Sequence, residues 1–279
     1  MDFLYLFHWI SWRSKFECNN KCIGQVDGLT DEADIANKFE LYFAQTCSNL
    51  SKEGSINLQN IYENMRPNYC GLPYDDELLF DVELVDKSVR SLERGKAAGL
   101  DTLTAEHLQN CHPALCTLLN KLFNLIIKTG YVPNSFGCSY TVPLPKSNYA
   151  SFSKSLTVDD FRGISISPVV SKIFEKCIFD RYQKFFETSD NQFGFKKGMG
   201  CSHAIYTVKN VVDHFSRQGS TVNLCALDLR KAFDKMNHHG LFITLMKRMI
   251  PINLLCTLEY WFSMCSTCVR WRSSFSNFF

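Results

Sequence analysis

The sequence lacks a hydrophobic run long enough to cross a membrane, and it lacks the pattern of a secretory signal. No stretch reaches the roughly 20 apolar residues that a membrane helix needs. The aromatic N-terminus has an acid at position 2, no basic start and no small-residue cleavage site. These absences predict an intracellular protein, cytoplasmic or nuclear, without a membrane partner.

The 13 cysteines lack the paired spacing of a zinc site or a disulfide framework. Cys265 and Cys268 form one CxxC pair with no second pair, and Cys18 and Cys22 are equally solitary. A helical stretch could place two further ligand pairs on different faces: His107, Cys111, His112 and Cys116. Without a matching pair elsewhere, we favour free thiols in a reducing compartment and expect no disulfides.

The chain has little net charge, but its charge is unevenly distributed. The formal net charge of the 279 residues is +2. Residues 1–90 carry 8 basic and 15 acidic groups, whereas residues 91–279 carry 22 basic and 13 acidic groups. The C-terminal excess suits a surface near nucleic-acid phosphates, although a solvated basic surface explains it equally well. Hydrophobic residues make up 46% of the chain, which is ample for a buried core.

Amphipathic segments outnumber strand-like ones. The sequence predicts helices at 30–46, 81–94, 113–129, 169–186, 201–215 and 241–246, and strands at 140–144 and 222–227. Residues 48–80 read as loop-rich. We therefore expect a mixed α+β fold without internal repeats.

The run 222–227 is the most informative of these segments. It is apolar and short, as in a strand buried on both faces, and Asp228 is the first charge after it. A carboxylate at the end of a buried strand is a candidate metal ligand. Asp234 follows six positions later, and a turn or capping role explains either aspartate as well.

Four segments resemble, in order, motifs of the reverse transcriptase domain of non-LTR (LINE-type) retrotransposons. They are Lys96-Ala-Ala-Gly-Leu-Asp101, Asp160-Phe-Arg162-Gly-Ile-Ser165, Asn191-Gln-Phe-Gly-Phe-Lys-Lys-Gly198 and Asp228-Leu-Arg-Lys-Ala-Phe-Asp234. Ala98, Leu100 and Gly163 stand where the family usually has proline, and Thr102 where it has glycine. The resemblance extends over roughly residues 24–279, including a linker-like stretch at 27–43.

The resemblance implies a role for each matching residue. Asp228 matches the first metal-binding aspartate of the polymerase palm, with the Leu229 carbonyl as a second ligand of Mg²⁺. Phe233 matches the aromatic under the incoming sugar; an ordinary core phenylalanine is the alternative. Arg162 and Lys146 match finger residues that hold the incoming triphosphate, and solvated surface charges are their alternative. Template-contacting positions of the family correspond to Gln192, Gly194 and Phe195.

The resemblance also implies what this chain lacks. In the family, further carboxylates lie in an aromatic-x-Asp-Asp hairpin that follows a Gly-x-x-Gln-Gly segment, and neither appears after Asp234. Tyr74-Asp75-Asp76 lies far too early, next to a proline turn. The expected organisation is an N-terminal extension (1–80), helix-rich fingers (81–221) and an incomplete palm (222–279), with the thumb and most of the palm missing.

A chain of this kind is expected to be a fragment of an RNA-directed DNA polymerase that is inactive alone. Its partners in the intact family are an RNA template and a DNA primer, and its oligomeric state is not indicated. The alternative is a catalytically dead retrotransposon remnant that retains RNA or DNA binding or has no function.

Overall fold

The structure is a computed structural model that describes residues 23–48, 52–73, 76–146, 156–196, 198–229 and 231–279. Its α-helices are α2 (Glu32–Ser48), α3 (Lys52–Met65), α4 (Val82–Arg90), α5 (Ala105–Gln109), α6 (Ala114–Thr129), α7 (Asn134–Gly137), α8 (Val169–Arg181), α9 (Cys201–Arg217), α10 (His238–Lys247) and α11 (Ile252–Met264). Short 3₁₀ turns are η2 (Arg66–Asn68), η3 (Asp76–Leu78), η5 (Val158–Asp160) and η6 (Gln183–Phe185). The strands are β1 (Cys138–Pro145), β2 (Phe161–Ile166), β3 (Ser266–Trp271) and β4 (Ser274–Phe275). This arrangement confirms the α+β class.

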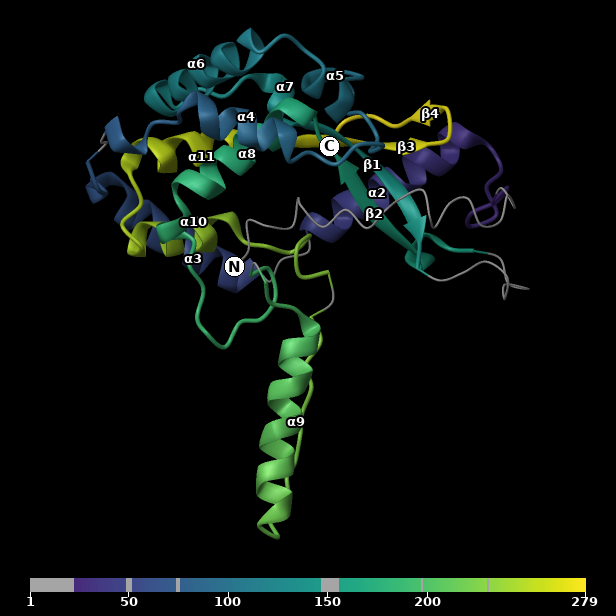
Figure 1. Ribbon diagram of the computed structural model, residues 1–279. Coiled ribbons are helices and arrows are strands. Elements are labelled where there is room, and N and C mark those ends of the chain that lie inside the picture. The colour runs from purple at the N-terminus through teal and green to yellow at the C-terminus, as the bar shows by residue number, and fades with distance from the viewer. Residues whose placement is uncertain (1–22, 49–51, 74–75, 147–155, 197, 230) are drawn as a thin grey trace.

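The described strands form one mixed sheet in the order β2-β1-β3-β4. β1 pairs with β2 antiparallel and with β3 parallel, while β3 and β4 form a short hairpin. Figure 1 shows the sheet at one side of a helical body, with α2 lying against it. Phe39 of α2 stacks on Trp271 of β3 with ring centroids 5.4 Å apart. Aromatic burial of this kind fixes α2 on the sheet.

The larger core lies among the helices. Phe123 of α6 and Phe174 of α8 are fully buried and pack at 5.0 Å, and Trp261 of α11 lies 5.3 Å from Phe174. Gly130 ends α6 in the left-handed conformation, at φ 72°, which glycine adopts without steric cost. This core joins segments that are more than a hundred residues apart in the sequence.

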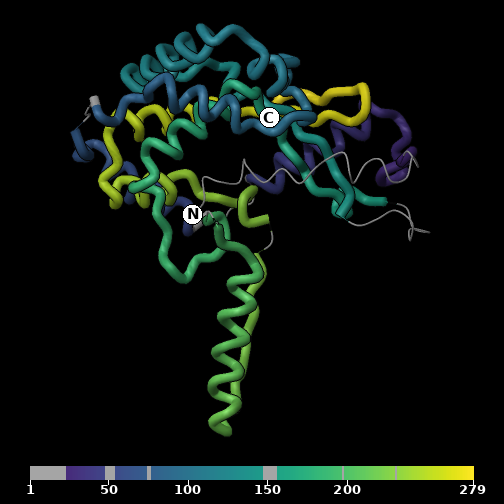
Figure 2. The backbone as a smooth tube through the Cα atoms, in the orientation of Figure 1, coloured from purple at the N-terminus to yellow at the C-terminus, as the bar shows by residue number. Residues whose placement is uncertain are grey.

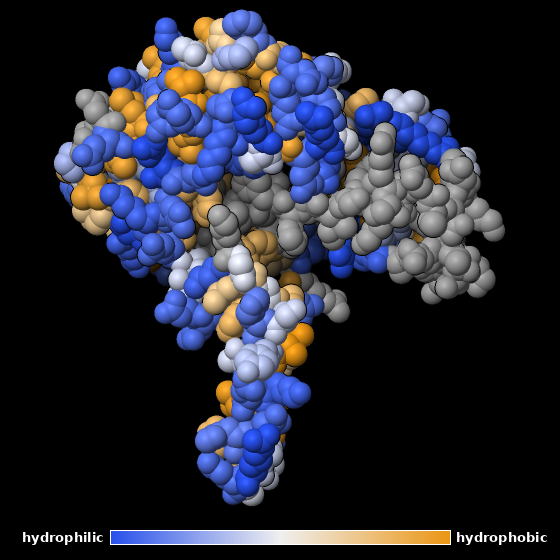
Figure 3. All heavy atoms as spheres, in the orientation of Figure 1, coloured by the Kyte–Doolittle hydropathy of each residue, from blue (hydrophilic) through white to orange (hydrophobic). Residues whose placement is uncertain are grey.

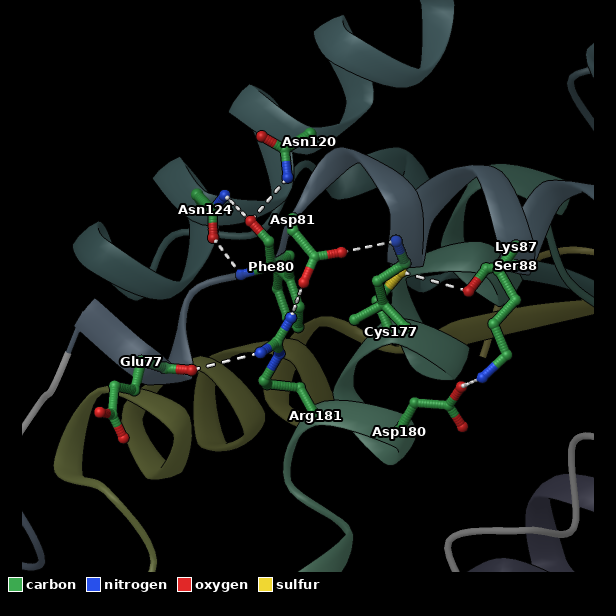
Figure 4. Close-up of polar contacts among 11 residues, drawn as sticks. Glu77, Phe80, Asp81, Lys87, Ser88, Asn120, Asn124, Cys177, Asp180 and Arg181 are labelled. Atoms are coloured by element: carbon green, nitrogen blue, oxygen red, sulfur yellow. Dashed lines mark hydrogen bonds and ion pairs between the residues drawn. The ribbon is translucent and has the colours of Figure 1, made fainter.

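Polar side chains hold the start of α4 against α6 and α8 (Figure 4). The Phe80 carbonyl accepts hydrogen bonds from Asn120 and Asn124 of α6, at 2.7 and 2.9 Å. Asp81 caps α4 by accepting from the Leu84 amide at 2.7 Å, and its other oxygen pairs with Arg181 of α8. The cap satisfies an amide that has no partner within the helix.

Helix α9 projects from the body as an arm, and the following segment runs back along it (Figures 1 and 2). None of its residues is buried. The space-filling view shows apolar patches on this arm (Figure 3). They come from exposed side chains that include Ile205, Tyr206, Val208, Val211 and Phe215.

Most sequence-predicted helices are present, with two corrections. Residues 48–80 are not loop-rich throughout, because α3 occupies Lys52–Met65 and packs Leu58, Tyr62 and Met65 against the helical core. Residues 222–227 are not a strand but an irregular segment. No helix in the described ranges has the length and apolar character needed to cross a membrane.

Candidate nucleotide and nucleic-acid interface

The β1–β2 hairpin positions the first two predicted site residues. Leu144 lies opposite Arg162 in the antiparallel register, and the Lys146 amide donates to the Asp160 carbonyl at 2.8 Å, one step beyond the strand end. Side chains of a strand alternate between its two faces, and diagonal neighbours on one face lie roughly 7–8 Å apart. Lys146 and Arg162 therefore share one face of the hairpin.

Helix α2 covers the opposite face. Phe161 is buried against Phe39 of α2, with ring centroids 5.0 Å apart. A Cβ added at Gly163 would lie 3.0 Å from the Phe43 ring and 2.9 Å from the Thr141 methyl group. Because α2 occupies this face so closely, Arg162 is directed away from it and is exposed.

The two cations differ in their local contacts. The Lys146 ammonium donates to the Asp159 carbonyl, so its position is fixed by the hairpin itself. Within the described part of the chain, the Arg162 guanidinium makes no hydrogen bond or ion pair, and only the main chain of Arg162 is paired, in the ladder with β1. A guanidinium that is exposed and unpaired can make paired hydrogen bonds to phosphate oxygens.

The sequence predicts that Asp228 lies at the end of a buried strand. The structure does not place it there. It follows an irregular segment in which Leu224 and Leu227 are 69% and 90% exposed, and Leu229 is 78% exposed. A buried strand needs hydrogen-bonded neighbours on its edges. None of the described strands pairs with this segment, so its apolar residues stay at the surface and Asp228 is exposed with them.

The structure brings two other predicted site residues together. Phe233 is 42% exposed, and its ring meets Phe195 edge-on at 6.3 Å. Phe195 has a left-handed backbone, at φ 59°, which is uncommon for an aromatic residue. The Gln192 amide donates to the Gly194 carbonyl at 3.3 Å and closes this turn. Phe233 is therefore a surface aromatic and not an ordinary core residue.

A polar cluster that the sequence did not indicate lies between α2, η5 and the turn after Asp228. The Tyr42 hydroxyl donates to Asp159 Oδ1 at 2.6 Å and accepts from Lys231 Nζ at 2.7 Å. Lys231 also donates to Thr46 Oγ1 at 3.0 Å. Tyr42 shares the α2 face of Phe39 and Phe43, so its aromatic ring gave no sign of a polar role.

Desolvation shifts two groups of this cluster. Burial raises the pKa of Tyr42, and its hydrogen bond to Asp159 raises it further. Asp234 is at the surface, but neighbouring atoms remove enough water to raise the pKa of its carboxyl, an effect that Lys231 opposes. The Tyr42 hydroxyl is therefore protonated near neutral pH and acts as a donor to Asp159.

The described residues do not assemble a metal centre. No group of three or more histidine, cysteine, aspartate or glutamate side chains within them is arranged to hold an ion. Reverse transcriptases generally use divalent metal ions, and two-metal chemistry needs several carboxylates around ions roughly 4 Å apart. Asp228 and the Leu229 carbonyl do not meet that requirement by themselves.

Comparisons with known proteins converge on one family. Residues 144–277 match the model of the family described as reverse transcriptase (RNA-dependent DNA polymerase). The chain is 26% identical over 200 residues to the RNA-directed DNA polymerase from mobile element jockey of Drosophila funebris, a match that covers 70% of this chain and 21% of that protein. It is 24% identical, over the same shares, to the probable RNA-directed DNA polymerase from transposon BS of Drosophila melanogaster. A third relative is the Pol polyprotein of the type-2 element R2DM of Drosophila melanogaster, 27% identical over 46% of this chain and 12% of that protein. The chain thus spans about a fifth of the length of the first two relatives.

Proposed function

Since this chain carries a reverse transcriptase region of the non-LTR retrotransposon type, we propose that it supplies the finger surface and the Asp228 motif of an RNA-directed DNA polymerase. It is a fragment in length relative to the proteins it matches. On this proposal the 279 residues bind nucleic acid but do not extend a primer alone. The proposed partners are an RNA template and a DNA primer.

The observation that carries this proposal is the two-faced β1–β2 hairpin. One face is covered by α2, while the other presents Lys146 and Arg162 side by side at its open end. Two neighbouring cations on a rigid hairpin suit the oxygens of a triphosphate or of a nucleic-acid backbone. We assign Lys146 and Arg162 to the incoming triphosphate, and we propose that without a nucleotide they bind the phosphates of an RNA strand.

The contact between Phe195 and Phe233 supports the remaining nucleotide assignments. Phe233 is proposed to lie under the incoming sugar, and Gln192, Gly194 and Phe195 to contact the template. Aromatic faces at the surface stack on sugars and bases without sequence preference. Their proximity would place the template and the incoming nucleotide on adjoining parts of one surface.

Asp228 is proposed as one ligand of Mg²⁺, with the Leu229 carbonyl beside it. Both are accessible, but further carboxylates are needed before the ion can be held. No catalytic step through Asp228 is therefore assigned to these residues alone. The domain division into an extension (1–80), fingers (81–221) and an incomplete palm (222–279) stays part of the proposal, as does an intracellular location.

RNA binding as a function of salt tests the finger assignment. Each phosphate contact that is lost should lower the slope of log affinity against log salt by about 0.7 for a single strand. We expect the double variant Lys146→Gln/Arg162→Gln to lower the slope by about 1.4. Arg90→Gln is the matched control, because Arg90 is exposed on α4 and pairs with Asp86. An unchanged slope in the double variant would refute the assignment.

Primer extension tests the proposed lack of activity. The unmodified chain should give no product above background on an RNA template with a DNA primer and Mg²⁺. Product that appears with the unmodified chain and disappears with Asp228→Ala would show that the fragment polymerises. If the chain neither binds RNA nor extends a primer, the alternative of a remnant without function is favoured.

A further inference from the structure

We propose that Tyr42 is a positioning residue that couples the finger loop (157–162) to the turn (231–234) that follows Asp228. The inference rests on the proposed function, because it concerns the relative placement of the phosphate-binding cations and Asp228. Tyr42 lies on α2, outside the residues that match the family model.

The Tyr42 hydroxyl makes two hydrogen bonds, one at the Asp159 end and one at the Lys231 end of the bridge. It donates to Asp159 Oδ1 at 2.6 Å and accepts from Lys231 Nζ at 2.7 Å. A hydroxyl has one proton to donate and lone pairs to accept, so it can make both bonds at once. Both partners are charged, and hydrogen bonds to charged groups are about twice as strong as those between neutral groups. Tyr42 thus joins residues that are 72 positions apart in the sequence.

The Lys231 end is held by more than one contact. Lys231 Nζ also donates to Thr46 Oγ1 at 3.0 Å and lies 4.1 Å from the centre of the Tyr42 ring. Thr46 is itself fixed, because its hydroxyl donates to the Tyr42 carbonyl at 2.8 Å. Lys231 is therefore bound by Tyr42 and Thr46, which lie on one turn of α2.

The backbone of Lys231 has an uncommon conformation in this turn. Its φ is 53°, in the left-handed region that a lysine rarely adopts. Such a conformation persists only where the surroundings impose it. The contacts of its ammonium with α2 act on this turn three residues after Asp228, together with the hydrogen bond that the Lys231 carbonyl accepts from the Lys235 amide at 3.1 Å.

The Asp159 end controls the finger loop. Asp159 lies in η5, where the Asp160 carboxylate accepts a hydrogen bond from the Thr157 amide. The Asp159 carbonyl accepts a hydrogen bond from Lys146 Nζ. Arg162 follows three residues later on β2. Moving Asp159 would therefore move both cations of the proposed phosphate site. Through Tyr42, α2 sets where these cations lie relative to the turn after Asp228.

Hydrogen–deuterium exchange of the full chain tests the coupling directly. Tyr42→Phe keeps the aromatic ring against Phe43 but removes the hydroxyl. We expect the protected amides of both segments to exchange about tenfold faster, since each end loses a charge-assisted hydrogen bond. For the turn (231–234) these are the amides of Lys235 and Met236, which donate to its Lys231 and Phe233 carbonyls. Tyr62→Phe is the matched control, because the Tyr62 hydroxyl also donates to a carboxylate, that of Glu259, at 2.6 Å. The control should leave both segments unchanged.

A second variant separates coupling from local support. Lys231→Met should speed exchange at 157–162, although Lys231 is far from that loop in sequence, and combining it with Tyr42→Phe should add no further increase there. If Lys231 only supported its own turn (231–234), Lys231→Met would not change exchange in the finger loop. The proposal is overturned if either single variant affects one segment only, if neither segment responds, or if Tyr62→Phe has the same effect.

The exchange experiment requires no nucleic acid, so its outcome is independent of the proposed polymerase role. An unchanged slope of log RNA affinity against log salt in Lys146→Gln/Arg162→Gln would refute that role and leave the bridge in place. Unchanged exchange in Tyr42→Phe, with normal RNA binding, would refute the bridge alone.

Discussion

At position 163, the absence of a side chain lets α2 lie directly on the hairpin. A Cβ there would approach the Thr141 methyl group to 2.9 Å and the Phe43 ring to 3.0 Å. Gly163→Ala should force these groups apart and lower the free energy of unfolding by about 1–3 kcal/mol. Urea unfolding followed by circular dichroism would measure the change.

Gly194→Ala is the control for this substitution. A Cβ at Gly194 would meet no atom within 4 Å, so the free energy of unfolding should stay within about 0.5 kcal/mol of the original. Equal destabilisation by the two variants would show that α2 does not sit on the hairpin as described.

Glu175 on α8 is a buried carboxyl that should make stability depend on pH. Burial raises its pKa from the ordinary 4.5 to about 8, although Lys172 opposes the shift. Its Oε2 atom has no hydrogen-bond partner in the part of the chain that the structure describes. Between these two pH values the folded protein retains a proton that the unfolded chain releases. Stability should therefore fall as pH rises from about 4.5 to about 8, and level off above that range.

The substitution Glu175→Gln removes this titration. We expect the variant to lose a pH dependence of up to roughly 1.4 kcal/mol per pH unit, so that it gains on the original protein between pH 5 and pH 8. Urea midpoints at the two pH values, compared between the variant and the original, measure the effect. Glu83→Gln, at an exposed site on α4, should keep the original dependence. Parallel pH profiles for all three proteins would contradict a buried Glu175.

Among the elements, α3 and η2 are fastened to α11 by a partly buried ion pair. Arg66 donates to both oxygens of Glu259, at 2.7 and 2.9 Å, and their side chains are 27% and 17% exposed. Arg66→Met should lower the free energy of unfolding by about 2 kcal/mol, because it leaves the Glu259 carboxylate shielded from water with less compensation. Chemical denaturation at neutral pH and low salt measures the loss.

Lys87→Met provides the comparison for Arg66→Met. Lys87 pairs with Asp180 at 2.9 Å, but the two side chains are 72% and 39% exposed. Water screens such a pair, and its loss should cost less than about 1 kcal/mol. If Arg66→Met and Lys87→Met lowered the free energy of unfolding equally, the Arg66–Glu259 pair would stabilise the protein no more than an exposed ion pair does.

The sequence predicted those elements whose signals are local. The apolar stripe of α2 and the glycine that ends α6 lie within the segments they define. Helix α3 was missed because its apolar residues are few, and Leu58, Tyr62 and Met65 gain their partners only from the helical core. The run 222–227 was predicted as a strand from composition, but a strand also depends on pairing with a neighbour, which composition does not encode.

In the candidate site too, the sequence indicates residues that lie in local motifs and misses residues whose partners are distant in the sequence. The motifs assign Lys146 and Arg162 to the same triphosphate, but the hairpin that both residues share comes from the structure, which pairs β1 with β2 and leaves both residues exposed. Tyr42 could not be found, because its partners Asp159 and Lys231 come from distant segments. A tyrosine on the apolar face of a helix looks like a packing residue until the chain around it is folded.

For the whole molecule, the described N-terminal residues, 23–48 and 52–73, do not form a separate layer. Helix α2 lies on the sheet, where Glu32 accepts a hydrogen bond from Ser273 at 2.7 Å. The segment after α3 reaches the other end of the molecule, where the Tyr69 hydroxyl donates to the Ile250 carbonyl at 2.5 Å. Both contacts join the N-terminal part of the chain to its last 30 residues. Such interleaving favours one cooperative unit over independently folding parts.

Two tryptophans make this cooperativity measurable. Trp261 lies in the helical core, and Trp271 lies in the cluster between α2 and the sheet. Each can be made the sole fluorescent tryptophan by replacing the other and Trp9 and Trp12 with phenylalanine. Because both clusters contain residues from both ends of the chain, we expect the two reporters to show the same urea midpoint, coincident with far-ultraviolet circular dichroism. A lower midpoint at Trp271 than at Trp261 would instead show that α2 and the sheet unfold separately, and the finger surface would then be the less stable part of the molecule.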